Sequence, residues 1–545
     1  MSTPEMSRRI LLAGGAALAT GVLLPESATA APSPSSPPAS GGPSPSPSGS
    51  GLAAAPTSVA APILTDAQVR TAIDGLDSLV ATTMQRTGIP GMAVAVVYKD
   101  QVPYLKGFGI RRVGSPDKVD TNTVFQLASL SKPVASTVVA GLVGDDVVAW
   151  DGATVKYDPT FALHNAYVTD NASLADLFSH RSGLPDHFGD LLESLGYDRT
   201  YILEHLRAAP LGPFRISYAY TNFGLTAAAV AAAKAAGKSW EDVSQTRLYT
   251  PAGMTSTSSR FADFEAAKNR VYTHVRSGSQ WAPTFVRDPD AQTPAGGASS
   301  TIADMSRFVR LQLANGELDG KRIIDETALS ATHTPQVISN PPRQPNARPG
   351  FYGLGWNVSF DAYGRLSLSH SGAFELGAAT AVNLWPTEQL GIVALTNAAP
   401  IGAAETITAT FLDVAQHGHP TIDWVPLLTK AFEDISNEGR SDTDYAHPPA
   451  GAKAAQAPST YTGTYANSFF GPMKVTVTGT KLDMALGPKN MTFALHHFDG
   501  DTFFYETTGE NATGPSGVTF TVSDGHATKV TVEDLNHNGL GTFTR

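Results

Sequence analysis

A serine and a lysine stand three residues apart at the predicted start of a buried helix. The segment 125–132 reads FQLASLSK, and apolar residues recur after it at helical spacing: Val134, Val138, Val139 and Leu142. One helical turn places Lys132 beside Ser129, so the amine can take the hydroxyl proton and make the serine a nucleophile. A surface serine and lysine on an ordinary helix would have the same spacing, so this pair needs support from elsewhere in the chain.

Two later motifs supply that support. Tyr220-Thr221-Asn222 follows first, and His370-Ser371-Gly372 lies farther along the chain. A serine acyl-transfer site needs a nucleophile, a base, a second proton relay and donors for the developing oxyanion. The three motifs together supply all of these groups. A helix cap at Ser129 or an aromatic core position at Tyr220 would explain each residue alone, but not the whole set.

The order Ser-x-x-Lys, Tyr-x-Asn, basic-Ser-Gly resembles the serine β-lactamase and penicillin-binding-protein superfamily, closest to its class C β-lactamase, D,D-peptidase and esterase branch. Four further blocks carry the same resemblance: 89–97 (IPGMAVAVV), 177–184 (LFSHRSGL), 294–304 and 352–356 (YGLGW). The likeness runs from about Leu64 to about Leu412. It implies an α+β fold, in which an antiparallel sheet flanked by helices lies beside a mostly helical subdomain and the serine helix lies at their junction.

The resemblance also implies a role for each site residue. Ser129 is the nucleophile and Lys132 its base, which requires burial or nearby positive charge because a lysine normally titrates near 10.4. Tyr220 relays protons to and from the reacting groups. Asn222 bonds Lys132 and the substrate, and the backbone N–H groups of Ser129 and Ala373 form the oxyanion hole. Ser371, Gly372 and Ala373 line the substrate.

His370 departs from the pattern, because many members of the superfamily have a lysine at this place. A histidine is mostly neutral at pH 7 and is a poorer anchor for a substrate carboxylate. Esterases, D-aminopeptidases and other general hydrolases of the superfamily often have histidine here, so the residue weakens the case for a dedicated β-lactamase. As a neutral donor near the substrate, His370 predicts a shoulder in the pH–rate profile at roughly pH 6 to 7.

The amino-acid composition limits which partners and cofactors we expect for this chain. The 545 residues are 42% apolar, enough for a large core and more than one domain. A net charge of −11 and few aromatic residues argue against a nucleic-acid partner. The chain has no cysteine, which excludes disulfides and thiolate metal sites. Its histidine pairs lack a completing carboxylate, so we expect no metal and no cofactor, only a small-molecule or peptide substrate. The oligomeric state stays open.

The first residues predict export. Arg8-Arg9 precedes an apolar stretch over 10–24 and the small-residue site Ala28-Thr29-Ala30, which resembles a twin-arginine signal peptide over 1–30. A membrane anchor is the alternative, but the stretch is short for a span. Residues 31–63 are rich in proline and serine and predict a disordered linker. We therefore expect a secreted or extracytoplasmic protein without a stable membrane span after cleavage.

The mature chain divides into a hydrolase domain over 64–436, a second linker over 437–458 and a β-rich domain over 459–545. In the first we expect an amphipathic helix from Ala67 and strands over 91–98, 366–371 and 391–396. In the last, Asp524-Gly525 between alternating strands predicts a hairpin. This part is similar to the small lipocalin-like barrel that often follows such catalytic domains, and we expect it to shape or cover the cleft.

These observations predict an exported serine hydrolase that acts through an acyl-enzyme on Ser129. Its substrates are esters, D-amino-acid peptides or amides, or β-lactams, and the sequence does not choose among them. One alternative is a penicillin-binding sensor or scaffold with little turnover. Another is a serine transacylase or peptide cyclase, although an export signal argues against carrier-bound substrates of the cytoplasm.

Overall fold

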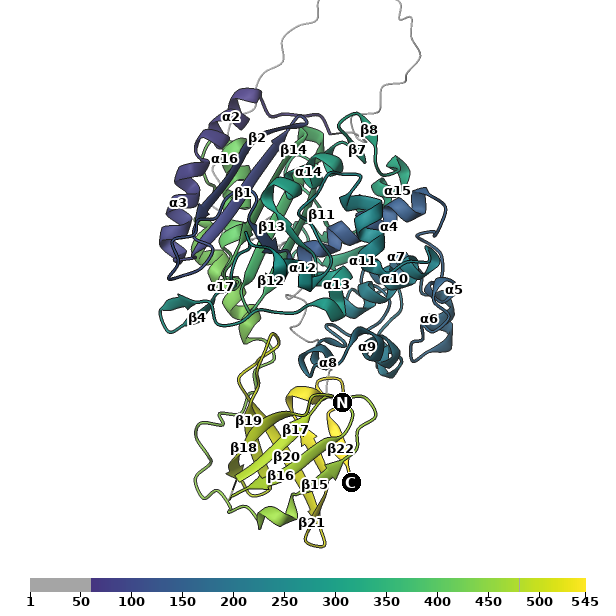
Figure 1. Cartoon of the computed structure of the whole chain (residues 1–545), viewed down its shortest axis with the longest axis vertical. Helices are drawn as coiled ribbons and strands as arrows, with labels where there is room; N and C mark the ends of the chain where they lie inside the picture. Colours follow the sequence, from purple (N-terminus) through teal and green to yellow (C-terminus); the bar gives the residue numbers. More distant parts are fainter. Residues whose placement is uncertain (1–59, 480) are drawn as a thin grey trace, which may run out of the picture.

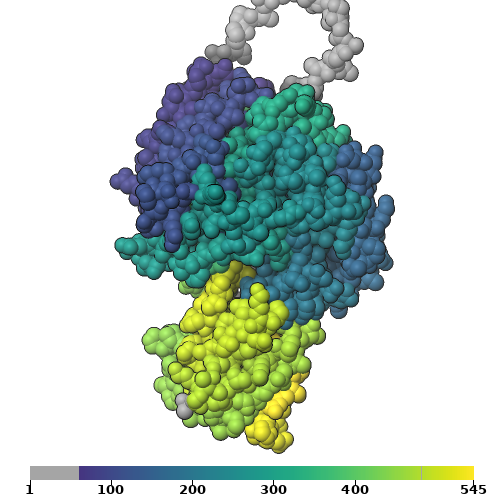
Figure 2. Space-filling view, in the orientation of Figure 1, coloured from purple at the N-terminus to yellow at the C-terminus, as the bar shows by residue number. Residues whose placement is uncertain are grey.

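The computed structural model describes residues 60–479 and 481–545, which form an α+β body and, at one end of it, a smaller β-domain (Figure 1). The space-filling view shows the β-domain, in yellow and green, abutting the larger body (Figure 2). The predicted signal peptide over 1–30 and all but the last four residues of the predicted linker over 31–63 lie outside the described residues. From Ile63 the chain is anchored, because the N–H groups of Ile63 and Leu64 donate to the Glu388 carboxylate.

An eight-stranded antiparallel sheet forms the centre of the larger body. Its strands, in spatial order, are β2 (Gln101–Gly109), β1 (Gly91–Tyr98), β14 (Leu390–Thr396), β13 (Ala378–Trp385), β12 (Leu366–Phe374), β11 (Asn357–Phe360), β10 (Gly350–Tyr352) and β9 (Val337–Asn340). The three strands expected from apolar runs are β1, β12 and β14. Strand β12, which carries the third motif, therefore lies inside the sheet between β11 and β13.

Helices cover both faces of this sheet. On β1, Met92, Val94 and Val96 pack into the cluster of the terminal helices, while Ala93, Ala95 and Val97 join the main core on the other face. The terminal helices are α2 (Asp66–Asp74), α3 (Leu76–Thr87), α16 (Ala403–His417) and α17 (Trp424–Asn437). The amphipathic helix expected from Ala67 is present but divided, since Gly75 ends α2 and begins α3.

The remaining helices build the second face and the helical subdomain, on the right in Figure 1. They are α4 (Ser131–Gly144), α5 (Thr154–Tyr157), α6 (Ala166–Asn171), α7 (Leu174–Phe178), α8 (Asp190–Ser194), α9 (Arg199–His205), α10 (Asn222–Ala235), α11 (Trp240–Ser244), α12 (Phe261–Ala266), α13 (Thr293–Gly296), α14 (Ile302–Leu313) and α15 (Glu326–Ser330). Helix α4 has nearly every residue buried and contacts α10, α13 and α15, so the serine helix lies at the junction of sheet and subdomain. Among the described residues, no helix combines the length and apolarity needed to cross a membrane.

Short strand pairs connect these helices. They are β3 (Val124–Gln126) with β6 (Ser299–Thr301), β4 (Val275–Ser277) with β5 (Gln280–Ala282), and β7 (Glu317–Leu318) with β8 (Lys321–Arg322). The β3–β6 pair matters for the site, because β3 leads directly into the turn that carries Ser129.

The β-domain is a nearly closed antiparallel barrel. Its strands run in sequence order: β15 (Gly463–Tyr465), β16 (Met473–Thr478), β17 (Lys481–Leu486), β18 (Met491–Asp499), β19 (Thr502–Glu506), β20 (Pro515–Ser523), β21 (His526–Val532) and β22 (Thr542–Thr544). A bridge between Ala466 and Thr544 joins the first strand region to the last. Asp524-Gly525 forms the turn of the β20–β21 hairpin, which confirms that prediction. The α+β fold followed by a small all-β domain is confirmed as well.

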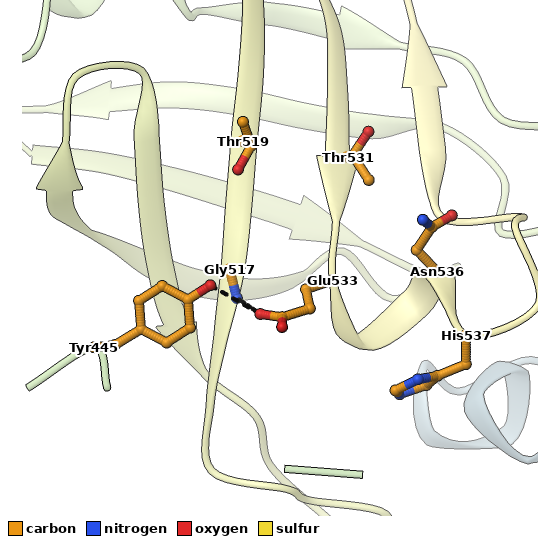
Figure 3. A pocket seen from close by; sticks show the side chains of 7 residues that line it. All are labelled: Tyr445, Gly517, Thr519, Thr531, Glu533, Asn536 and His537. Atoms are coloured by element: carbon orange, nitrogen blue, oxygen red, sulfur yellow. Dashed lines mark hydrogen bonds between the residues drawn. The ribbon is translucent and has the colours of Figure 1, made fainter. Parts of the chain in front are cut away.

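The segment after α17 is held against the barrel. The Glu533 carboxylate accepts from the Tyr445 hydroxyl and from the N–H of Gly517 on β20 (Figure 3). It also accepts from the Ser441 hydroxyl. These contacts tie the connection between the two domains to the outside of the β-domain.

Aromatic residues join the two domains directly. The hydroxyls of Tyr197 and Tyr201 donate to the carbonyls of Phe470 and Phe469 on the β15–β16 loop. The rings of Phe188 and Phe469 lie 5.1 Å apart, centroid to centroid. The main hydrophobic cluster therefore continues from the helical subdomain into the barrel. Apolar burial and directed hydrogen bonds together fix the β-domain beside α8 and α9.

Candidate active site

Ser129 lies in a short 3-10 turn, Ala128–Leu130, between β3 and α4. Ala128 adopts a φ of 49°, an unusual conformation for a residue with a side chain and one that the surroundings must enforce. Ala298 provides part of that enforcement. Its carbonyl accepts from the N–H of Leu127, and its own N–H donates to the Ser131 hydroxyl. The serine is thus presented on a braced turn rather than on a regular helix.

Lys132 is fully buried one turn after Ser129. Its Nζ lies 2.9 Å from Ser129 Oγ, 2.8 Å from Asn222 Oδ1 and 3.0 Å from the carbonyl oxygen of Ala295. Burial lowers the pKa of the amine well below its ordinary value; Asp190 opposes this shift and Arg287 adds to it. The environment therefore favours the neutral amine that can accept the serine proton.

Tyr220 and Asn222 stand at the start of α10, on the other side of the lysine. Lys132 Nζ lies 4.5 Å from the centroid of the Tyr220 ring. Burial raises the pKa of the Tyr220 phenol well above its usual value, although a hydrogen bond with Ser129 opposes the shift. The phenol consequently keeps its proton near neutral pH and can pass protons only as a neutral hydroxyl. Asn222 has its oxygen on Lys132 and its Nδ2 2.8 Å from Asp190 Oδ2.

Strand β12 approaches the serine turn closely at Gly372. A Cβ there would lie 2.2 Å from the carbonyl oxygen of Leu127 and 3.0 Å from the N–H nitrogen of Leu130. Only glycine fits, and its absence of a side chain lets the backbone of β12 lie against the turn that carries Ser129. The Thr380 hydroxyl on β13 also donates to the Leu127 carbonyl, at 2.8 Å. This packing sets the next residue, Ala373, against the serine turn. Ser129 and Ala373 line one pocket, which also contains Tyr220 and His370.

His370 lines the pocket, but both of its ring nitrogens are engaged within the protein. Nδ1 lies 2.6 Å from the carbonyl oxygen of Ser371, which identifies Nδ1 as the protonated nitrogen. Nε2 therefore accepts from the Tyr352 hydroxyl at 2.9 Å. Burial lowers the pKa of the ring to about 3, with Lys132 adding to the shift. The expected neutrality holds, but a titration of His370 near pH 6 to 7 is wrong, because burial moves it far below that range.

Two further site residues, His187 and Asp190, were not predicted from the sequence. His187 Nδ1 lies 2.7 Å from Asp190 Oδ2, the oxygen that also accepts from Asn222. Burial alone would favour the neutral ring, yet Asp186 and Asp190 raise the His187 pKa to about 9. Asp190 thus connects a charged imidazole to the amide that holds Lys132. Both residues lie in the PDHFGD stretch over 185–190, directly after the LFSHRSGL block, where their proximity to α4 has no local sequence signal.

These groups surround a pocket of about 500 Å³. The predicted residues that line it are Ser129, Tyr220, His370, Ser371 and Ala373, while Lys132 and Asn222 lie directly behind Ser129. The opposite wall comes from the end of α17 and from residues 509–513 of the β-domain. Among the described residues, no three histidine or acidic side chains gather as a metal site would require. The arrangement can perform nucleophilic acyl transfer with a lysine base.

Comparison with known protein families agrees with this geometry. The family model described as Beta-lactamase matches residues 76–416. A second model, described as Domain of unknown function (DUF3471), matches residues 447–540 and so covers the β-domain with part of the segment before it.

Two relatives, one named as a hydrolase and one as a penicillin-binding protein, match most of the first domain. An unguisins hydrolase of Aspergillus campestris is 25% identical over 412 residues, which are 71% of this chain and 74% of that protein. Penicillin-binding protein 4 of Amycolatopsis lactamdurans is 29% identical over 296 residues, 52% of this chain and 75% of its own. Among solved structures, the octameric penicillin-binding protein homologue from Pyrococcus abyssi has a TM-score of 0.54 at 16% identity. It covers 84% of this chain and 98% of its own, and at this identity it supports the fold alone.

Proposed function

Because the chain belongs to the β-lactamase family of serine hydrolases, we propose that it is an exported hydrolase that acts through an acyl-enzyme on Ser129. One observation carries the proposal: the Nζ of a fully buried lysine lies 2.9 Å from Ser129 Oγ. A lysine serves as a base only when it is uncharged, and burial without a carboxylate in direct contact favours that form.

Acylation follows from the contacts around Ser129. Neutral Lys132 takes the Oγ proton as Oγ attacks the acyl carbonyl carbon, which gives a tetrahedral intermediate with a negative oxygen. The N–H groups of Ser129 and Ala373 are the expected donors to that oxygen. As the intermediate collapses, the bond to the leaving group breaks, and the proton held by Lys132 passes through the Tyr220 hydroxyl to that group. The products are an ester on Ser129 and the protonated leaving group.

Deacylation repeats these steps with water. As the water oxygen attacks the Ser129 ester, Tyr220 and Lys132 together take a proton from that water. They return a proton to Ser129 Oγ when the acyl group leaves. Asn222 keeps the Lys132 amine in place between these steps, since its own amide is fixed by Asp190. His370 orients the wall of β12 through Tyr352 and holds no proton that titrates near neutral pH.

The surroundings of His370 favour esters and amides over β-lactams as substrates. Where many relatives have a permanent cation, this chain has an imidazole that burial keeps neutral. The site therefore lacks a fixed positive charge on β12 to hold the carboxylate of a β-lactam. The first-named relative is described as a hydrolase of unguisins, and we extend from it only the general class of acyl substrates. Export is proposed from the arginine pair, apolar stretch and small-residue site within residues 1–30.

A substrate panel tests this proposal. Purified protein is assayed with p-nitrophenyl esters, nitrocefin and peptides ending in D-Ala-D-Ala, alongside Ser129→Ala. We expect steady turnover of the esters, slower or absent turnover of nitrocefin, and loss of all activity in Ser129→Ala with an unchanged melting temperature. A phosphonate should add once to the wild type, and peptide mapping should place the adduct on Ser129. An adduct on another residue would overturn the assignment.

The same panel separates the alternatives. A single burst without turnover on every substrate would identify a penicillin-binding sensor. Formation of an amide when an amine is added, in place of the free acid, would identify a transacylase. Accumulation of the protein in the cytoplasm of its natural host, with residues 1–30 retained, would contradict export.

A further inference from the structure

A loop of the β-domain enters the active-site pocket. The loop between β19 and β20, residues 507–514, rises from the barrel toward the larger body (Figure 1), and residues 509–513 line the pocket that contains Ser129. Its base is closed, because the Thr507 N–H and hydroxyl both donate to the carbonyl of Gly514. Its tip is held by Asn511, whose Nδ2 donates to Ser194 Oγ and to the carbonyl of Asp190. The loop is therefore a bound part of the pocket wall.

Glu510 of this loop fills a site built for a carboxylate. Its Oε1 accepts from the N–H of Glu375 at 3.0 Å, and its Oε2 accepts from the N–H of Leu376 at 3.2 Å. Arg287 Nη1 lies 2.7 Å from Oε1, and both side chains are nearly buried, with 10% of Arg287 and 13% of Glu510 exposed. The two N–H groups directly follow β12, the strand of the third motif. An arginine and two consecutive backbone donors are a recurrent arrangement for binding carboxylates.

Arg287 is already balanced by a second acid. Its Nη2 lies 2.7 Å from Glu193 Oε2, and its guanidinium lies 4.2 Å from the centroid of the Phe374 ring. Glu193 and Glu510 together place two carboxylates on one cation. Glu375 and Glu438 also line the pocket, which Arg440 and His187 share. The donors of this carboxylate site are thus occupied, and a substrate carboxylate placed there would meet two acids that already share the Arg287 cation.

We propose that Glu510 is a specificity-determining residue: it occupies the carboxylate site of the pocket from within the chain and thereby selects neutral acyl groups against anionic ones. The inference rests on the hydrolase activity proposed above and adds to it the class of substrate. It also gives the β-domain a role, because the residue that excludes anionic substrates comes from that domain and not from the β-lactamase-like one.

The test uses two esters of equal chain length, p-nitrophenyl hexanoate and mono-p-nitrophenyl adipate, which differ only by a terminal carboxylate. We expect the wild type to prefer the hexanoate. In Glu510→Ala the donors of Arg287, Glu375 and Leu376 become free. The ratio of kcat/KM for adipate over hexanoate should then rise by about tenfold or more. Glu510→Gln, which keeps the volume but removes the charge, should move the ratio in the same direction by less.

A matched variant controls for loosening of the loop. Asn511→Ala removes the tip contacts with Ser194 and Asp190 but leaves the carboxylate site filled, so the ratio should stay at the wild-type value. If Asn511→Ala raises the ratio as much as Glu510→Ala does, mobility of the loop and not Glu510 sets the preference. If Glu510→Ala raises both rates equally or leaves the ratio unchanged, the proposal is overturned.

A binding measurement keeps the inference independent of turnover. Sodium acetate should raise the melting temperature of Glu510→Ala in a saturable way, with sodium chloride at equal ionic strength as the control, and should leave the wild type unchanged. Equal effects of acetate on both proteins would mean that no carboxylate site is opened. Absence of ester turnover by the wild type would refute the proposed function, while the acetate titration would still decide whether Glu510 fills an anion site.

Discussion

The two walls of the pocket treat buried ionisable groups in opposite ways. On the wall of the β-lactamase-like domain, Lys132 and His370 are buried without an opposite charge in direct contact, and burial moves the pKa of each toward its neutral form. Across the pocket, Glu510 of the β-domain is also buried, but it lies 2.7 Å from the guanidinium of Arg287, which opposes the rise that burial causes in the pKa of the Glu510 carboxyl. A buried group without a partner thus moves toward its neutral form and can take part in proton transfer, whereas a partner of opposite charge works against that shift.

The two domains therefore contribute different kinds of group to the site. The α+β domain provides the nucleophile, the base and the relay, all uncharged in the resting state. The β-domain contributes a charged residue to the opposite wall and no candidate catalytic group. Substitutions on either side of the pocket should distinguish these contributions, with the largest effects at the catalytic groups.

Removing the neutral base should have the largest effect. Lys132→Gln keeps polar contacts to Asn222 and Ala295 but cannot take a proton, so kcat for a neutral ester should fall by roughly a thousandfold or more. Lys234→Gln is the control, because Lys234 lies on the same helix as Asn222 and binds Asp158 away from the pocket. Activity of Lys132→Gln within a few fold of wild type would remove the lysine from the mechanism.

Removing the relay hydroxyl should cost less. Tyr220→Phe preserves the ring beside Lys132 but loses the phenol, and general acid–base groups of this kind contribute on the order of 10²–10⁴ in rate. Tyr249→Phe serves as the matched control, since Tyr249 is equally buried and bonds Ser259 outside the pocket. The loss should be larger for a poor leaving group than for p-nitrophenolate, which needs little protonation. An equal loss on both substrates would contradict a role in leaving-group protonation.

Glu405 is a buried acid whose pKa is raised by burial, although a hydrogen bond with Ser371 opposes the shift. It is buried on α16, and burial raises its pKa to about 7, from an ordinary value of 4.5. The folded state then binds more protons than the unfolded state between these values, so stability falls as pH rises from about 4.5 to about 7, by about 3 kcal/mol in total.

Glu405→Gln should remove that loss. Its free energy of unfolding, measured by denaturant titration, should exceed that of the wild type at pH 8 more than at pH 4.5. The exposed Glu433 on α17 provides the control, since Glu433→Gln should show no such pH-dependent difference. A wild type whose stability rises over this interval beyond the rise in Glu405→Gln would mean that the pKa of Glu405 is not raised.

The pH–rate profile on a neutral ester should show the smallest effect of substitution. The rate should rise as pH rises through the lowered pKa of Lys132, because the base must lose its proton. His370→Gln should lower kcat by about five- to tenfold through loss of the Tyr352 hydrogen bond, without shifting the midpoint of the profile.

A step in the pH–rate profile near pH 7 would belong to Glu375, whose pKa is raised to about 7 by burial and by Glu510. Glu375→Gln should abolish that step.

Much of the fold and several of the reacting residues can be predicted from the sequence, because the patterns that indicate them are local. Helical spacing brings Lys132 to Ser129, an apolar run identifies β1, and Asp524-Gly525 marks the β20–β21 turn. Gly372 was recognisable as part of a motif, but its reason is tertiary: no Cβ fits beside the Leu127 carbonyl. Sequence reasoning missed His187, Asp190 and Arg287, because they contact residues that are distant along the chain and follow no periodic pattern.

The amino-acid sequence establishes which groups are present and which of them are neighbours along a helix or strand: Ser129 with Lys132, Tyr220 with Asn222, and the series His370 to Ala373. Their ionisation depends on tertiary packing, since a pKa responds to burial and to charges from distant segments. It neutralised His370, kept His187 charged, and brought Glu510 across a domain boundary to Arg287. Spacing is a property of the backbone and can be read in advance, whereas the electric environment of a pocket exists only after separate segments have packed together.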